Sequence, residues 1–354
     1  MMKKEYKNTY IGATVYTYLL FLLYVKDEDI DKCFYFLTKD FNKELLDKIG
    51  EDGLVINTYT SSITLFENKS VFRIINRYYN RLRNVLIWNK SRFFYKKHYP
   101  FVKDTRIFTH MPPGHFLITA IVDTNDYTLI EDGLANHIQQ EKQNKETAEK
   151  KKENIFEIAI ELFFLRIEKY KGIASKRLAK KIFTRNDHND PKVEVVSLQA
   201  LWDNSSERKK NFILDRFCFR RDLIDGLQKR SVIVLTQPFY EDSWVEEIHT
   251  EEQKIDLYRA AIEKEGESNV IIKTHPREKT DYKKYFPDAV VVSQPIPFEL
   301  LELNGLRLKK AYTISSTAAL NINTPDCEII QIETGKNLIG EIDFKRICKN
   351  KKNG

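Results

Sequence analysis

The segment Ile271-Ile272-Lys273-Thr274-His275-Pro276-Arg277 is a short apolar run that leads directly into three cationic side chains. The run predicts a buried strand over 269–273, which Pro276 ends. The same kind of strand pattern recurs at 231–235, 289–293, 310–314 and 328–332, with helical patterns at 251–264 and 297–303 and a helix starting at 317. Strands that alternate with helices predict βαβ units and a parallel sheet.

The N-terminal part of the chain shows the same alternation. Strand patterns lie at 10–13, 32–37, 53–59, 105–109 and 126–130, and helical patterns at 71–88 and 115–122. The apolar run Tyr16–Val25 is too short for the ~20 residues that span a bilayer, so it predicts a buried helix. We therefore expect an α/β fold built from parallel sheets. It would have two Rossmann-like domains facing a central cleft, with ligands at the carboxyl ends of the strands.

We divide the chain into an N-terminal Rossmann-like domain (1–138), a helical insert or linker (139–228) and a C-terminal Rossmann-like domain (229–354). Residues 139–152 are almost purely polar, and 154–183 carry apolar residues at helical spacing. That second stretch predicts a helical insert, a homodimer contact or a membrane-surface element.

The totals point to a globular protein with a basic surface. Of 354 residues, 42% are hydrophobic and 31% charged, and the net charge is +7. The charge indicates either a solvated lysine-rich surface or attraction to nucleotide-sugars, acidic glycans or membrane headgroups. The basic stretches lack an aromatic stacking pattern, so we do not expect nucleic acid. Four cysteines fit neither a zinc site nor a disulfide framework and indicate a cytoplasmic protein.

An acidic turn, Glu131-Asp132-Gly133, follows the predicted strand 126–130. It is either an ordinary Asp-Gly turn or the site of a general base, because paired carboxylates hinder one another's ionisation. A second candidate base lies in the loop 235–242, at Glu241 or Asp242. The loop 109–115 carries His110 and His115, which are candidate acceptor contacts.

Three further patterns indicate a phosphate or nucleotide site. Lys273, His275 and Arg277 could hold a phosphate and protonate a departing one. Glu299, after Pro297, is either helix punctuation or an acceptor for two ribose hydroxyls. The hydroxyls of 315–317 (Ser315, Ser316, Thr317) are either helix caps or phosphate ligands.

In their order, these motifs resemble the bacterial sialyltransferases: acidic-acidic-Gly, Lys-x-His-Pro, Pro-Phe-Glu, then Ser-Ser. Thr-Gln-Pro at 236–238 and Ser-Ser-Thr-Ala-Ala-Leu at 315–320 are most similar to glycosyltransferase family 52, the lipooligosaccharide and capsule sialyltransferases. The similarity runs from about Tyr10 to Thr334 and is dense only at the motifs. It implies a GT-B fold, CMP-sialic acid as donor and an inverting transfer without metal or cofactor. The acceptor would be a sugar hydroxyl, such as that of a terminal galactose on a surface glycan.

The resemblance also assigns roles. In related families the base is the second acidic residue, here Asp132, whereas in family 52 it lies in the Gln-Pro loop, at Asp242 or Glu241. His275 would be the acid or stabilise the leaving phosphate, and Lys273 would add charge. Ser315 and Ser316 would bind the phosphate, and Glu299 the ribose. The donor-binding set is completed by Gln237, Pro276, Arg277 and Thr317. Glu at 131 departs from the Asp of the motif.

Two rival hypotheses remain open. The first is another GT-B glycosyltransferase with a different nucleotide sugar, and the second is a non-catalytic basic protein that binds membrane or polyanion. A lipid-linked acceptor would bring the enzyme to the inner face of the cytoplasmic membrane as a peripheral protein.

Overall fold

The computed structural model describes residues 4–38, 41, 43–56, 86–87, 90–111, 120–122, 125–133, 177–184, 189–241 and 248–332. The chain forms two compact units. One comprises 1–40 and 46–209, and the other comprises 41–45 and 210–354. Each unit has its own parallel sheet, as the sequence predicts.

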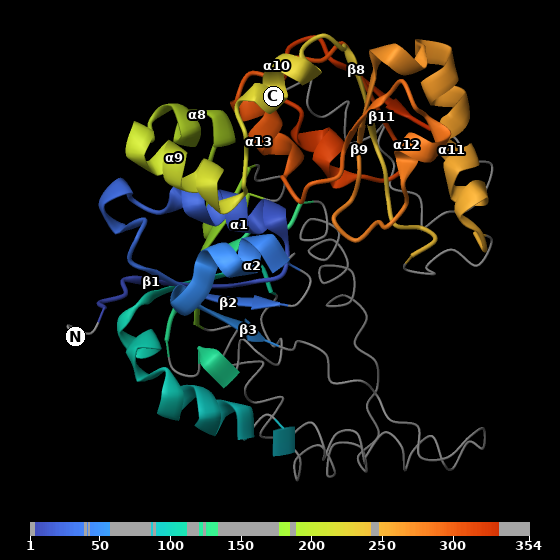
Figure 1. Ribbon diagram of the computed structural model, residues 1–354. Coiled ribbons are helices and arrows are strands. Elements are labelled where there is room, and N and C mark those ends of the chain that lie inside the picture. The colour runs from blue at the N-terminus through green and yellow to red at the C-terminus, as the bar shows by residue number, and fades with distance from the viewer. Residues whose placement is uncertain are drawn as a thin grey trace, which may run out of the picture. The chain divides into compact units, whose positions relative to one another are not determined.

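The first unit contains a seven-stranded sheet in the order β3-β2-β1-β4-β5-β6-β7, and every pair is parallel (Figure 1). The strands are β1 (Asn8–Gly12), β2 (Cys33–Thr38), β3 (Gly53–Ile56), β4 (Arg106–Thr109), β5 (Tyr127–Ile130), β6 (Leu178–Phe183) and β7 (Val193–Val195). The strand order reverses between β1 and β4, so a ligand site is expected where these two strands end.

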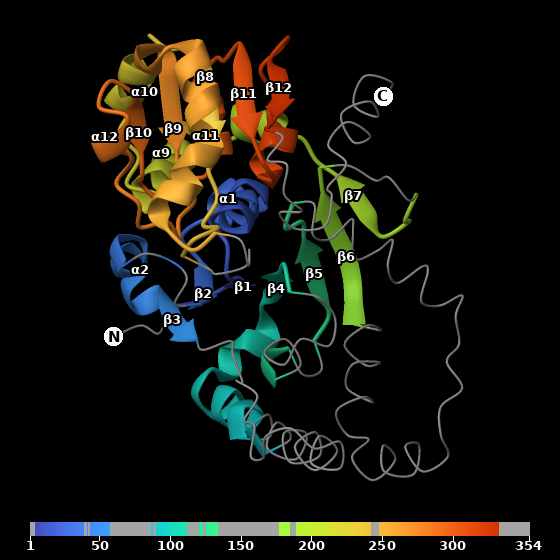
Figure 2. The same cartoon turned by 90° about the vertical axis from the view of Figure 1, so that its right-hand side faces the viewer.

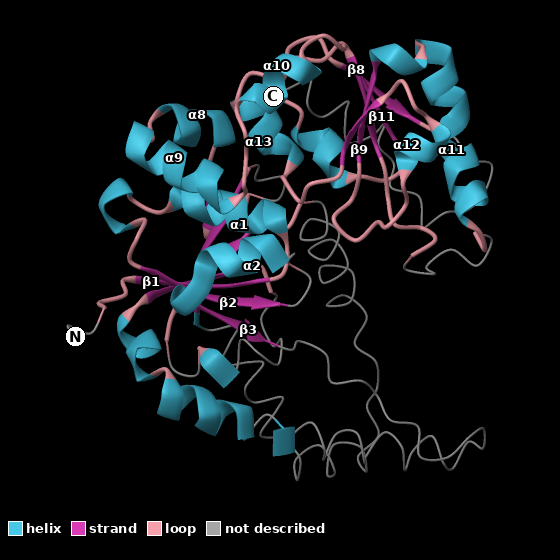
Figure 3. Ribbon diagram, viewed as in Figure 1, coloured by secondary structure: helices cyan, strands magenta, loops and turns pink. Residues whose placement is uncertain are grey.

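Helix α1 (Val15–Tyr24) explains how this sheet is covered on one face. Thr14 caps its first turn, and its apolar sequence predicts a helix that is buried all round. In Figure 3 α1 lies over the strands of this sheet. The ring of Tyr10 stacks on Phe21 at 4.9 Å between centroids, and Phe21 meets Phe108 edge-to-face at 5.2 Å. The buried helix predicted from the apolar run Tyr16–Val25 is therefore confirmed.

The second unit contains a five-stranded parallel sheet in the order β10-β9-β8-β11-β12 (Figure 2). Its strands are β8 (Val232–Leu235), β9 (Val270–Lys273), β10 (Val290–Val292), β11 (Lys310–Thr313) and β12 (Glu328–Gln331). β8 and β9 are buried along their whole length, as expected for parallel strands covered on both faces. Here the strand order reverses between β8 and β11.

The remaining helices have different lengths and ends. They are α2 (Lys43–Ile49), α8 (Leu198–Asp203), α9 (Glu207–Arg216), α10 (Asp222–Leu227), α11 (Glu251–Glu265), α12 (Tyr282–Tyr285) and α13 (Phe298–Leu303). α11 begins with a complete capping box between Thr250 and Gln253, which fixes its first turn. Among the described residues, no helix is long and apolar enough to cross a membrane.

One expectation is wrong. Residues 178–183 form β6, not helix, and with β7 they complete the first sheet, so the range 139–228 is not a helical insert throughout. A helix begins at 317 as expected, and it is a 3-10 helix of 5 residues, Thr317–Asn321. The helix predicted at 71–88, most of that at 115–122, and residues 139–176 lie outside the described residues.

Candidate active site

Three loops follow neighbouring strands at the carboxyl edge of the first sheet. β1, β4 and β5 are adjacent and parallel, and they lead to Thr14, His110 and Asp132. The structure thus brings together two predicted site residues at the point where the strand order reverses.

The two carboxylates of the acidic turn bind different neighbours, contrary to the expectation that they form a mutually repelling pair. Glu131 is buried and accepts hydrogen bonds from the backbone N–H of Thr184 and from its hydroxyl, the latter at 2.8 Å. Asp132 is only half-buried and accepts from the Thr14 hydroxyl at 3.0 Å. Glu131 therefore anchors the loop after β6, and Asp132 is the carboxylate that can reach a substrate.

A chain of hydroxyl groups leads away from Asp132 into the core. The hydroxyl oxygens of Thr14 and Thr17 lie 2.9 Å apart. The Thr17 hydroxyl oxygen in turn lies 2.6 Å from the hydroxyl oxygen of Tyr10. A Cβ at Gly12 would lie 2.1 Å from the Tyr10 hydroxyl oxygen, so glycine lets the phenol reach Thr17. Burial raises the pKa of Tyr10 well above its ordinary value, and the charge of Asp132 adds to this. Tyr10 therefore stays a neutral hydroxyl.

His110 is buried at the end of β4, and its Nδ1 has no hydrogen-bond partner among the described residues. Burial lowers its pKa, although the nearby Asp132 opposes this. At neutral pH the ring is therefore an uncharged group beside the Asp132 carboxylate. His115, the other acceptor-side candidate, lies outside the described residues.

In the second unit, β9 ends in a tight turn whose hydrogen bonds hold both the backbone and the ring of His275. The Glu278 N–H donates to the His275 carbonyl at 3.0 Å, and the His275 N–H donates to the Glu278 carboxylate at 2.6 Å. The Arg277 N–H donates to Nδ1 of the His275 ring at 3.2 Å. Since Nδ1 is an acceptor, the neutral ring carries its proton on Nε2.

The environment of His275 keeps this ring neutral. Burial lowers its pKa to about 3, and the positive charges of Arg277 and Lys273 add to this, while Glu241 opposes it. A neutral imidazole is a weak proton donor for full transfer but a good hydrogen-bond donor through Nε2–H.

Lys273 is buried, and its side chain contacts the loops that follow β9 and β10. Its ammonium group donates to the carbonyls of Thr274 at 2.9 Å and Gln294 at 3.1 Å. Burial lowers its pKa to about 8, against the opposing charges of Glu278 and Glu299. Lys273 thus joins the loops after β9 and β10 and supplies positive charge from beneath the surface. Pro276 and Arg277 are exposed in the turn.

Glu299 is buried in the first turn of α13 and accepts a hydrogen bond from the Asn321 amide at 2.8 Å. Burial raises its pKa to about 7; Asn321 and the Lys273 charge oppose this, and the neighbouring Glu302 reinforces it. A carboxyl group that exchanges its proton near neutrality can accept from hydroxyls or donate to a carbonyl.

The hydroxyls after β11 lie at the same edge of the second sheet. Ser315 is half-buried, and Ser316 is buried with its N–H donated to the Thr313 hydroxyl at 2.8 Å. The following 3-10 helix begins at Thr317 and has 5 residues, and Ser316 at its N-cap makes no side-chain capping hydrogen bond.

The loop after β8 carries the other expected contacts. The Gln237 N–H donates to the Tyr258 hydroxyl at 3.0 Å, and its side chain is half-buried. Glu241 accepts from the buried Lys254 at 2.7 Å and from the Lys279 N–H at 2.9 Å, so its carboxylate is already engaged. Asp242 lies outside the described residues.

A match to a protein-family model identifies the family of this chain. The model for glycosyltransferase family 52 matches residues 110–335, more than half of the chain. The chain belongs to glycosyltransferase family 52. A protein of unassigned function from Haemophilus influenzae is 32% identical to this family 52 chain over 200 residues, which span 55% of this chain and 58% of that protein.

Solved structures give the fold of this family 52 chain. An α/β-galactoside α-2,3-sialyltransferase from Photobacterium phosphoreum is 12% identical, with a TM-score of 0.50 over 92% of this chain and 90% of that one. A 2,6-sialyltransferase from Photobacterium sp. JT-ISH-224, solved with CMP and lactose, is 11% identical, with a TM-score of 0.55 over 92% and 71%. The GT-B domain of a Photobacterium damselae sialyltransferase is 12% identical, with a TM-score of 0.50 over 91% and 90%. The fold is of GT-B type, as predicted.

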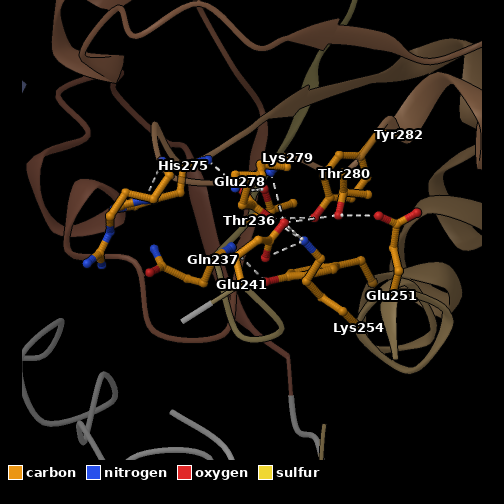
Figure 4. A network of polar contacts seen from close by, with 12 residues as sticks. Thr236, Gln237, Glu241, Glu251, Lys254, His275, Glu278, Lys279, Thr280 and Tyr282 are labelled. Atoms are coloured by element: carbon orange, nitrogen blue, oxygen red, sulfur yellow. Dashed lines mark hydrogen bonds and ion pairs between the residues drawn. The ribbon is translucent and has the colours of Figure 1, made fainter. Parts of the chain in front are cut away.

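Two residues linked to the predicted site residue His275 escaped the sequence analysis, Glu278 and Lys254. Figure 4 shows both at the centre of a polar network that joins the loops after β8 and β9. The Lys254 side chain is fully buried and lies 3.2 Å from the Glu278 carboxylate. A lysine in the polar helix α11 is expected to be exposed, so only the fold shows its role.

The second unit also contains a cavity of about 210 Å³ near the end of β10. It is lined by Cys218, Arg220, Asp222, Leu223, Gln294 and Ile296. Its wall at Gln294 is the loop that Lys273 holds. Within the described part of the chain, no three or more His, Cys, Asp or Glu residues are grouped to hold a metal ion.

Proposed function

We propose that this chain is an inverting, metal-independent sialyltransferase that moves sialic acid from CMP-sialic acid to a hydroxyl of an acceptor sugar. The observation that carries the proposal is the His275 turn, which presents a neutral ring with its proton on Nε2 at a sheet's carboxyl edge. Membership of glycosyltransferase family 52 supports it, and so does the shared fold with sialyltransferases.

The chemistry assigns one group to each side of the reaction. The bond from the anomeric carbon of sialic acid to the phosphate oxygen of CMP breaks, and the acceptor oxygen attacks from the opposite face. His275 Nε2–H donates to the departing phosphate, which preorganised donors can stabilise without a metal. A carboxylate takes the acceptor's proton. Glu241 is bound by Lys254, so the candidates are Asp132 and Asp242.

The nucleotide part of the donor belongs at the carboxyl edge of the second sheet. Ser315 and Ser316 bind the phosphate together with His275, and the buried Glu299 accepts from the ribose hydroxyls. The cavity at Gln294 and Ile296 takes the base, because it lies on the segment that leads into Glu299. Gln237 and Arg277 complete the donor contacts.

The acceptor is an oligosaccharide that ends in a galactoside, on a lipooligosaccharide or capsule, and His110 and His115 contact it. A solved structure of similar fold contains lactose, which supports this acceptor class. Incubation with CMP-sialic acid and a panel of galactosides, read by mass spectrometry, tests donor and acceptor together. Transfer from UDP- or GDP-sugars and none from CMP-sialic acid would replace the proposal with the rival glycosyltransferase activity.

A lipid-linked acceptor requires contact with a membrane surface, for which the helix at 90–98 is suited. Phe93 is 70% exposed there, with the exposed lysines Lys90, Lys96 and Lys97 around it. A basic helix with an outward aromatic side chain binds anionic lipid surfaces. Flotation with anionic vesicles should recover the wild type and Val55→Ser, whose apolar side chain is also exposed, but little Phe93→Ser. Equal recovery of both variants contradicts this contact.

A further inference from the structure

Helix α11 places one buried lysine between two carboxylates that come from different loops (Figure 4). Lys254 Nζ lies 2.7 Å and 2.9 Å from the two carboxylate oxygens of Glu241, and 3.2 Å from Glu278. The Lys254 and Glu278 side chains are 0% exposed and that of Glu241 is 9% exposed. Glu241 lies in the loop after β8 and Glu278 in the turn after β9, so this lysine ties the two loops together.

Four hydrogen-bond donors bind the Glu278 carboxylate, two on each oxygen. Lys254 and the Tyr282 hydroxyl (2.7 Å) bind Oε1, while the Thr236 hydroxyl (2.5 Å) and the His275 N–H (2.6 Å) bind Oε2. An ionised carboxylate is an acceptor through both oxygens and satisfies all of these groups. A glutamine could not, since its amide N–H₂ would face two of the donors.

The charges of this cluster do not cancel, because two carboxylates face one lysine. The excess negative charge is met by neutral donors, among them the Lys279 N–H at 2.9 Å and the Thr280 hydroxyl at 3.2 Å, both on Glu241. Burial favours protonation of Glu241, but Lys254 and the Lys279 N–H outweigh it and lower its pKa. Taking charges out of water is costly, so such a cluster adds little stability compared with apolar packing.

We propose that Glu278, held in place by Lys254, is a positioning residue for His275 and that the same cluster fixes the Gln-Pro loop against the His275 turn. The carboxylate binds the His275 backbone N–H, so it sets where the ring begins. The Arg277 N–H, in the same turn, then sets how the ring is rotated. For its catalytic consequence the proposal rests on the sialyltransferase function.

The test compares Glu278→Gln with a matched control, Glu265→Gln. Glu265 is also a carboxylate that accepts from a lysine and a tyrosine, Lys310 at 2.8 Å and Tyr312 at 2.6 Å. It lies at the other end of α11, beside the start of β11, and so away from the His275 turn. Each variant is examined by urea unfolding, by ¹⁵N-histidine NMR and by initial rates with CMP-sialic acid and a galactoside.

The chain has seven histidines, so the His275 ring signals can be assigned with His275→Asn. We expect both variants to lose stability. Only Glu278→Gln should shift the Nδ1 and Nε2 resonances of His275, and its kcat should fall about 10–100-fold at little changed KM. If Glu278→Gln does not fold, Thr236→Val takes its place, because it removes one of the four donors to Glu278. It should shift the His275 ring signals, whereas the Glu265→Gln control should leave them unmoved.

Several outcomes overturn the proposal. They are unmoved His275 resonances in Glu278→Gln, equal shifts in Glu265→Gln, and shifted resonances with unchanged kcat. A wild type that folds but does not use CMP-sialic acid instead refutes the proposed function, while the NMR comparison still decides whether Glu278 positions His275. The two failures are therefore distinguishable.

Discussion

The two sheets hold their reactive side chains by opposite means. In the first unit, Asp132 lies at the end of a chain of neutral hydroxyls, from Thr14 through Thr17 to Tyr10. In the second unit, the His275 turn is held by a buried cluster of ions around Lys254. Hydroxyls can be removed singly at about 1 kcal/mol each, whereas loss of one buried ion leaves its partner uncompensated and costs about 3–5 kcal/mol.

The largest expected effect concerns which unit supplies the base. Asp132→Asn and Asp242→Asn each remove one candidate carboxylate with little change in shape. Loss of a general base lowers kcat about 10²–10⁴-fold, so one variant should be nearly inactive and the other close to wild type. Initial rates with CMP-sialic acid and a galactoside measure this.

A loss in Asp132→Asn alone places the base at the end of the hydroxyl chain, and a loss in Asp242→Asn alone places it beside the ionic cluster. Full activity of both single variants and of the double variant would contradict a carboxylate base altogether.

Replacement of His275 comes next. His275→Ala removes the Nε2–H donor from the leaving phosphate, and loss of one such donor costs about 10²–10³-fold in kcat. Unchanged urea unfolding shows that the fold survives. Because burial lowers the pKa of His275 to about 3, the wild-type kcat/KM should show no acid limb from this ring between pH 8 and 5. A His275-dependent limb near pH 6.5 contradicts the neutral-donor role.

A smaller effect tests the hydroxyl chain. Thr14→Val keeps the shape of the side chain but removes the hydrogen bond to Asp132, and kcat should fall about ten-fold if Asp132 is the base. Thr14→Ser restores the hydroxyl and should restore most of the rate. Similar rates in the valine and serine variants would show that the hydroxyl does not orient Asp132.

The sequence predicted the parts of each unit that depend on local pattern. The apolar runs that form β8 and β9 are correct to within a residue, because strands buried on both faces are uniformly apolar. β6 was missed because Lys180 and Lys181 interrupt it, and a lysine-rich segment at helical spacing favours a helix. Its sheet partner β5 lies about fifty residues earlier in the chain, a pairing that no local pattern reveals.

The residues of the candidate site divide in the same way, into those that a local sequence pattern marks and those whose contacts depend on the fold. His275 and Glu299 could be proposed because one follows a strand and the other begins a helix, which the sequence marks. Thr14 was not singled out, since its partner Asp132 is 118 residues away. Lys254 and Glu278 have the composition of surface residues, and their function depends on burial that the sequence does not show.

The smallest expected effect is on the pH dependence of stability. The pKa of His275 in the folded chain, about 3, lies below its ordinary 6.5, so below pH 6.5 the unfolded chain binds a proton that the folded chain does not. This contribution to stability is complete above pH 6.5 and is lost as the pH falls toward 3. His275→Asn has no such proton, so its unfolding free energy relative to wild type should rise by about 1 kcal/mol between pH 7 and 5, allowing for solvent screening of a half-buried ring. Urea unfolding at both pH values measures the difference. A constant difference would mean that His275 titrates alike in the folded and unfolded chains, and the hydrogen-bonded turn around it would then not keep the ring neutral, in contrast to the role proposed for it.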